Sequence, residues 1–224
     1  MRARGWLASA ALLATLFALS AGPVAPRSAS AEAATPPSSL SPDATPRAVI
    51  DSLHTTLLEV MKEAKTLGYS GRYERLAPVL ASHFDTPWMA EKSIGREWAK
   101  LAEPDRERMI DAFRRFTTAN YAGRFDGYGG ERFETLRDEP SLQSTMLVYT
   151  RLVESNGEVT ELNYRLRQVG PSWRIIDVYL NGTVSELALR RSEYSSIIKR
   201  DGLEALIDAL EAKISKLEAG DVAS

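Results

Sequence analysis

The chain has 224 residues, with 28 Lys and Arg against 30 Asp and Glu, and it contains no cysteine. This slightly acidic balance argues against a nucleic-acid partner, because domains that bind nucleic acids usually display a basic excess. The lack of cysteine excludes disulfides, thiol catalysis, cysteine-ligated zinc and a lipid-modified N-terminal cysteine.

An export signal is predicted at residues 1–31. Arg2 and Arg4 precede an apolar run from Trp6 to Leu19, and a stretch of small residues ends at Ala31, which is the order of a secretory signal peptide. The run of about 14 residues is shorter than the roughly 20 residues that cross a bilayer. We therefore expect cleavage after Ala31 and a soluble product in the periplasm. Cleavage would leave 25 basic against 30 acidic residues, a net charge of −5.

Residues 32–45 predict a disordered linker, because they consist largely of Ala, Pro, Ser and Thr and offer little to bury. A single domain is expected over residues 46–217, of which 46–126 should be mainly helical. Thr45-Pro46 is a helix start, and apolar residues then repeat at helical spacing up to Gly68. Further helices are predicted around residues 73–84, after Thr86-Pro87 and after Pro104.

An antiparallel sheet is predicted over residues 131–180, after a glycine-rich turn at 127–130. Four strands are expected at residues 132–137, 143–154, 160–169 and 172–180, and the short turns between them make neighbours antiparallel. Leu162, Tyr164 and Leu166 alternate with polar residues such as Asn163 and Arg165, which indicates one buried and one wet face.

Two C-terminal helices are predicted over residues 183–217. Thr183 with Glu186 and Asp201 with Glu204 have the spacing of capping boxes, and each pair precedes an apolar stripe. The order along the chain is helices, a meandering sheet and further helices. This order indicates an α+β fold in which helices cover one face of a curved antiparallel sheet.

The sequence contains few candidates for catalysis. Neither His54 nor His83 has a second metal ligand at i+3 or i+4, so no metal site is predicted. Catalytic-serine, phosphate-loop and dinucleotide motifs are absent from the sequence, so no cofactor is expected. Regular alternation would place Asp177 on the face of Trp173, Ile175 and Tyr179. There it would be either a general base or, as we favour, a member of a structural ion pair, for instance with an arginine of a covering helix.

Several segments together resemble one known family. They are the runs from Phe84 through Asp85-Thr86-Pro87-Trp88-Met89-Ala90 to Trp98, from Phe113 to Tyr121, Trp173 to Val178, Gly182 to Ser185, Glu193-Tyr194 and Gly202 to Leu206. In this order they resemble the MlaC, or toluene-tolerance, family of periplasmic phospholipid shuttles. The segment Gly68 to Tyr73 with Leu76-Ala77-Pro78 is similar to a branch associated with hopanoid genes.

The resemblance implies a nuclear-transport-factor-like sheet packed against a helical subdomain, with acyl chains held between them and no reaction catalysed. The ligand would be a phospholipid or a hopanoid-like lipid. The implied partners are an inner-membrane ABC transporter complex with its substrate-binding ring and an outer-membrane lipoprotein complex. Combining the resemblance with strand alternation and helical spacing gives ten expected lipid-binding residues: Trp88, Met89, Phe113, Phe116, Met146, Val148, Leu162, Tyr164, Leu166 and Trp173.

Two alternatives to a lipid carrier follow from the residues. One is a small enzyme on the same cone-like fold, with Asp177 as base and Tyr164 or Tyr179 as hydrogen-bond donor. The other is an interaction module whose apolar residues fill an ordinary core.

Overall fold

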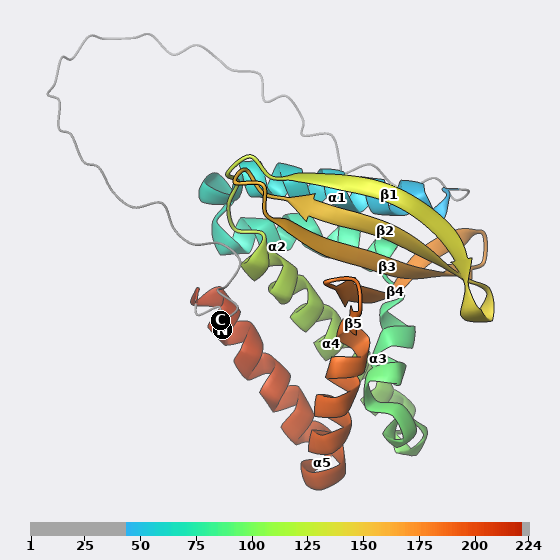
Figure 1. Cartoon of the computed structure of the whole chain (residues 1–224). Helices are drawn as coiled ribbons and strands as arrows, with labels where there is room; N and C mark the ends of the chain where they lie inside the picture. Colours follow the sequence, from blue (N-terminus) through green and yellow to red (C-terminus); the bar gives the residue numbers. More distant parts are fainter. Residues whose placement is uncertain (1–43, 221–224) are drawn as a thin grey trace, which may run out of the picture. The chain divides into compact units, whose positions relative to one another are not determined.

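The computed structural model describes residues 44–220. The predicted signal peptide and nearly all of the predicted linker lie outside these residues. Within them, helices α1 (Pro46–Lys62), α2 (Ala64–His83), α3 (Thr86–Ile94) and α4 (Glu103–Arg124) come first, with a 3-10 helix, η1 (Gly95–Lys100), between α3 and α4. Strands β1 (Arg132–Ser141), β2 (Thr145–Val153), β3 (Val159–Val169), β4 (Ser172–Leu180) and β5 (Val184–Ser185) follow, and α5 (Glu186–Glu218) ends the order (Figure 1).

The start of the first helix agrees with the local sequence signals. Thr45 caps α1 by accepting a hydrogen bond at 3.2 Å from the backbone N–H of Ala48, and Pro46 occupies the first turn. The predicted helix up to Gly68 is interrupted earlier, because α1 ends at Lys62 and α2 begins at Ala64. Gly68 is a second break, with φ of 61° inside α2, a conformation that glycine adopts at low cost.

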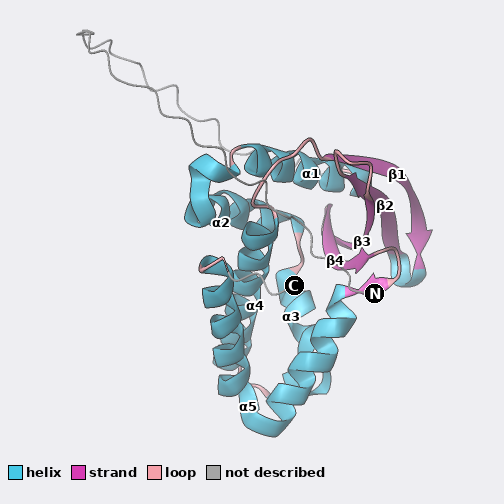
Figure 2. Ribbon diagram, turned by 60° about the vertical axis from the view of Figure 1, so that its left-hand side comes forward, coloured by secondary structure: helices cyan, strands magenta, loops and turns pink. Residues whose placement is uncertain are grey.

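The five strands form one sheet in the order β1-β2-β3-β4-β5, and every pair is antiparallel. The strands curl, and the helices gather on one side of them (Figure 2). The predicted α+β class with a curved antiparallel sheet is therefore confirmed. One face of β3 is buried as predicted, but Asn163 on the other face is buried too, because its side-chain oxygen accepts a hydrogen bond from the backbone N–H of Thr150 at 3.1 Å.

Helix α5 has two arms. The backbone at Gly202 has φ of 87° and ψ of 179°, so the helical hydrogen-bond ladder is broken there. Residues 186–201, here called the first arm, and residues 203–218, the second arm, diverge in the V visible in Figures 1 and 2. The predicted capping box at Thr183 is wrong, since Ser185 is the residue that caps the first arm.

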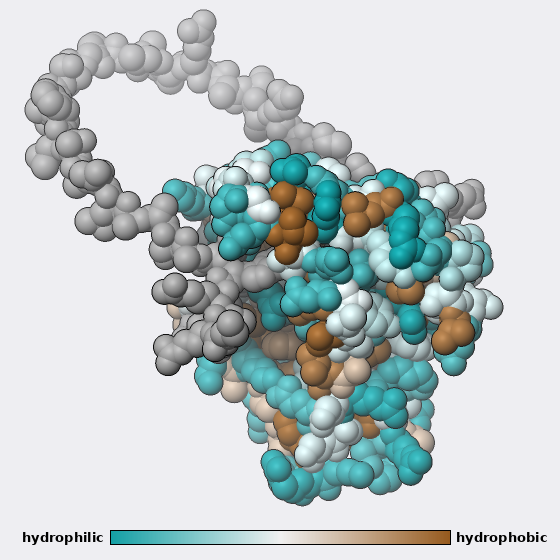
Figure 3. Space-filling model, in the orientation of Figure 1, coloured by the Kyte–Doolittle hydropathy of each residue, from teal (hydrophilic) through white to brown (hydrophobic). Residues whose placement is uncertain are grey.

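The surface of the described residues carries scattered apolar side chains. Leu142, at the turn between β1 and β2, is 78% exposed, and Leu189 on the first arm of α5 is 55% exposed. On the face shown in Figure 3, apolar residues alternate with hydrophilic ones. Every helix among residues 44–220 is too short or too polar to serve as a membrane-spanning segment.

Candidate functional site

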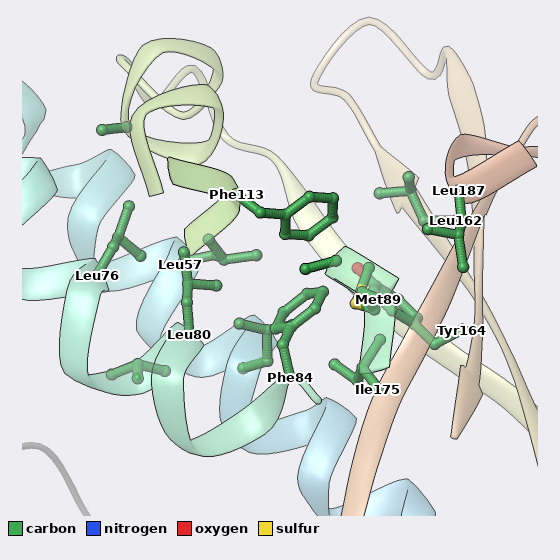
Figure 4. Close-up of a cluster of buried hydrophobic side chains, with 14 of the residues drawn as sticks. Leu57, Leu76, Leu80, Phe84, Met89, Phe113, Leu162, Tyr164, Ile175 and Leu187 are labelled. Atoms are coloured by element: carbon green, nitrogen blue, oxygen red, sulfur yellow. The ribbon is translucent and has the colours of Figure 1, made fainter. Parts of the chain in front are cut away.

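A layer of apolar side chains fills the space between the helices and the inner face of the sheet. Phe84, after the end of α2, and Phe113 of α4 extend toward Met89 of α3 and the strand residues Tyr164 and Ile175 (Figure 4). All five side chains are at least nine-tenths buried. We call the cluster of buried hydrophobic residues to which these five belong the apolar layer.

The structure brings nearly all of the sequence-predicted lipid residues into the apolar layer. Six are buried in it, and three more are partly buried against it, whereas Met146 is only partly buried, near the start of β2. The six buried ones are Met89, Phe113, Val148, Leu162, Tyr164 and Leu166, and the three partly buried ones are Trp88, Phe116 and Trp173. Nine of the ten predicted residues thus belong to one cluster or pack against it, although they come from α3, α4, β2, β3 and β4.

Sequence reasoning missed the share of α1 and α2 in this layer. Leu53 and Leu57 of α1 and Leu76 and Leu80 of α2 are almost completely buried in the same cluster. Their helical spacing was the available signal. It showed that these helices bury a face, but not that this face meets the sheet.

Two pockets of the described residues have volumes of about 230 and 330 Å³, and both are lined by residues of helices alone. Neither of them lies against the sheet. The side chains of the apolar layer pack against one another, so an apolar chain placed among them would have to displace some of these contacts.

One polar pair lies inside the layer. Nε2 of His54 and the hydroxyl of Tyr164 are 3.1 Å apart, and the imidazole stacks on Phe133 with ring centroids 4.0 Å apart. Burial lowers the pKa of His54 from 6.5 to about 3, and burial raises the pKa of Tyr164 well above its ordinary value. Burial therefore favours the neutral form of both side chains.

Asp177 is not where regular alternation predicted it. A bulge at Ile176 shifts the register, so that Ile175 pairs with Leu166 on the inner face whereas Asp177 pairs with Arg165 on the opposite face. Bulges of this kind turn the following side chains to the other side of a sheet. The predicted common face of Asp177 and Trp173 is therefore wrong.

The carboxylate of Asp177 supports the start of α5. Its Oδ1 accepts hydrogen bonds from the backbone N–H groups of Val178 at 2.8 Å and Leu187 at 3.1 Å, and its Oδ2 accepts one from the Ser185 hydroxyl at 2.6 Å. An acid at this end of a helix satisfies free N–H groups and complements the helix dipole. The favoured ion pair is absent from the described residues, and the carboxylate bonds the start of α5 instead.

Asp85 joins the helical part to the sheet. Its Oδ1 accepts a hydrogen bond from the backbone N–H of Trp88, which caps α3, and its Oδ2 accepts one from Nε of Arg167 on β3 at 2.5 Å. Its own backbone N–H donates to the carbonyl of Ile175 on β4 at 2.9 Å. These bonds fix the start of α3 against two strands and thereby position Trp88 and Met89.

The candidate site is an apolar layer that contains one polar pair, His54 and Tyr164. No group of three or more His, Cys, Asp or Glu side chains that could hold a metal occurs in the part of the chain that the structure describes. Asp177 serves a helix start. The fold and the site thus define an α+β protein with a curved antiparallel sheet and an apolar layer under its helices.

The comparisons with known proteins agree with this class. Residues 51–212 match the family model described as MlaC protein, so the chain belongs to the MlaC family. A solved structure with the same fold is the phospholipid-binding protein from Ralstonia solanacearum in complex with a phospholipid. It has a TM-score of 0.68 and 17% sequence identity, and the match covers 78% of this chain and 99% of that one. No curated protein matches the chain.

Proposed function

We propose that this protein is a periplasmic carrier that binds a phospholipid or a related membrane lipid and shuttles it between membrane complexes. The observation that supports this proposal is the apolar layer, which lies between the helices and the sheet. Membership of the MlaC family and the phospholipid in the Ralstonia solanacearum protein point the same way.

The need for such a carrier follows from the hydrophobic effect. A two-chain lipid crossing water alone would expose on the order of thirty methylenes at about 0.8 kcal/mol each, or roughly 24 kcal/mol. Chains placed in the apolar layer would avoid nearly all of that cost. Because the lipid would leave one apolar environment for another, its net transfer energy can be small, and the exchange can be reversible.

The partners in this proposal are those that the family resemblance implies: an inner-membrane ABC transporter complex with its substrate-binding ring and an outer-membrane lipoprotein complex. The segment from Gly68 to Tyr73 resembles the hopanoid-associated branch, so a hopanoid-like lipid is the other candidate ligand. Purification from the native host, followed by mass spectrometry of an organic extract, would identify the lipid.

A pair of valine substitutions tests the binding site. Val148 is fully buried in the layer, whereas Val159, at the start of β3, is 49% exposed. We expect Val148→Asp to abolish lipid co-purification in the fraction that folds, because a charge among apolar atoms opposes acyl chains. Val159→Asp should leave the bound lipid unchanged. Equal lipid content in the wild-type protein and a folded Val148→Asp variant would contradict the proposal.

A further inference from the structure

A polar pocket lies beside the apolar layer, between α4 and both arms of α5. Its volume is about 230 Å³. Phe116 and Arg124 of α4, Arg190 and Tyr194 of the first arm, and Lys213 of the second arm line it. The ten predicted lipid residues include only Phe116 from this pocket, so the sequence analysis assigned no role to the rest.

The pocket is cationic although the chain as a whole is acidic. Three cations and two carboxylates line it, and one of the carboxylates, Glu193, pairs with Lys213 at 2.5 Å. Arg124 and Arg190 form no ion pair with any residue between 44 and 220. Arg190 donates a hydrogen bond to the Thr117 hydroxyl at 3.2 Å, which leaves further donors of its guanidinium for another group.

Tyr194 provides an independent indication of a ligand. Its side chain is 1% exposed, and its hydroxyl is buried without a hydrogen-bond partner among the described residues. A buried hydroxyl without a partner is costly, so each such group in a native protein requires a reason. Burial raises the pKa of Tyr194 to about 12, so the hydroxyl keeps its proton and can donate it to an acceptor oxygen.

The pocket adjoins the apolar layer. The ring of Tyr194 meets that of Phe113 edge to face, with centroids 6.5 Å apart. The guanidinium of Arg190 lies 5.3 Å from the ring centroid of Phe113 and 5.2 Å from that of Phe116. An amphiphile with its chains in the layer would therefore meet the cations of the pocket, next to the buried ring of Tyr194, where the layer ends.

We propose that this pocket binds the phosphate of the lipid headgroup, with Arg124 and Arg190 on the phosphate oxygens and the Tyr194 hydroxyl as a third donor. Guanidinium groups match phosphate oxygens in geometry and charge. The pocket volume is below the range for whole small molecules, which suits a headgroup whose chains lie elsewhere. This assignment rests on the proposed carrier function and narrows the ligand to a phosphate-bearing amphiphile.

The test compares two lipids that share their acyl chains. Phosphatidylcholine vesicles containing labelled phosphatidylglycerol or labelled diacylglycerol are mixed with the purified exported protein, and uptake is measured. The double variant Arg124→Gln, Arg190→Gln should take up phosphatidylglycerol about tenfold less than wild type, by loss of charge-assisted hydrogen bonds, and diacylglycerol equally well. Arg200→Gln, at an exposed position outside the pocket, is the charge-matched control and should change neither. An equal loss for both lipids, or no loss, would overturn the headgroup assignment.

A second variant covers the case in which the double variant does not fold. Tyr194→Phe removes a hydroxyl that has no partner in the protein, so its melting temperature should not fall below that of wild type. Its uptake of phosphatidylglycerol should nevertheless fall several-fold. Unchanged uptake by this variant would show that the hydroxyl does not meet the ligand and would overturn its role as a donor.

Titration with inorganic phosphate separates the two sources of the anion. Weak binding, with a Kd of about 1 mM or above, together with avid phosphatidylglycerol uptake supports a lipid phosphate. Inorganic phosphate that binds more tightly than the lipid and blocks no lipid uptake would overturn the headgroup assignment. A wild-type protein that takes up neither labelled lipid would contradict the carrier function itself, so the two failures are distinguishable.

Discussion

Helix α4 makes two contacts of opposite character. It buries Phe113 in the apolar layer. Toward the second arm of α5 it presents Arg108, which donates two hydrogen bonds to Glu204 at 2.6 and 2.7 Å, and Arg115, which donates a pair to Glu211. Apolar contacts have no fixed direction, so lipid methylenes could replace them, whereas the forked pairs require one geometry. This difference indicates that the apolar layer is where the molecule would open and that α4 and the second arm form a stiffer frame.

The largest effect is expected from truncation in the apolar layer. Phe113 is 1% exposed, and Phe113→Ala should lower the free energy of unfolding of the lipid-free protein by about 3–5 kcal/mol, because it leaves a cavity. Urea denaturation measures this loss. Leu189→Ala, at a position that is 55% exposed, is the control and should cost less than about 0.5 kcal/mol. A cost below about 1 kcal/mol for Phe113→Ala would mean that the layer is not packed as a core.

The next effect is expected at the start of α5. Asp177→Asn should lower the free energy of unfolding by about 2–3 kcal/mol. The amide that replaces the carboxylate is neutral and has one acceptor oxygen instead of two, so the hydrogen bonds to the helix start become weaker and fewer. Thermal melts measure the loss, and Asp208→Asn at an exposed position of α5 is the control. Lipid uptake by the folded fraction should change little. An Asp177→Asn variant that is as stable as wild type but has lost lipid uptake would instead favour the enzymatic alternative.

These two sites also show what the sequence could and could not reveal. The α+β class was readable because Thr45-Pro46, the helical stripes and the alternation of β3 are local patterns. The face of Asp177 was not, because a single bulge at Ile176 reverses alternation and leaves no local signature. The cationic pocket was also out of reach, since Arg124 and Arg190 are far apart in the sequence and meet only through the packing of α4 against α5.

Between about pH 6.5 and pH 5, a pH effect of intermediate size should arise from His54. Because its folded-state pKa of about 3 lies below the ordinary 6.5, the unfolded chain binds the extra proton. The stabilisation is therefore complete above pH 6.5 and is lost toward pH 3, by about 1.4 kcal/mol per pH unit. His54→Phe should flatten the slope of unfolding free energy against pH between 6.5 and 5 relative to wild type. An unchanged slope in that variant would show that His54 is accessible to protons in the folded state.

The smallest effect is expected in the frame. Arg115 and Glu211 have side chains that are 42% and 37% exposed, so solvent screens their attraction. Arg115→Gln should cost about 0.5–1 kcal/mol, and less at high salt. Unfolding in urea at low and high salt would check this. A loss as large as that of Phe113→Ala would remove the distinction between the two contacts of α4.

The most direct test of a layer that opens is a distance between the helices and the sheet with and without lipid. Because the chain has no cysteine, cysteines introduced at the exposed positions Glu107 of α4 and Gln168 of β3 would be the only sites for spin labels. Pulsed electron resonance should give a longer distance in the lipid-loaded protein than in the lipid-free protein. The same distance in both, with lipid bound in a measured one-to-one ratio, would contradict the separation of helices and sheet around acyl chains.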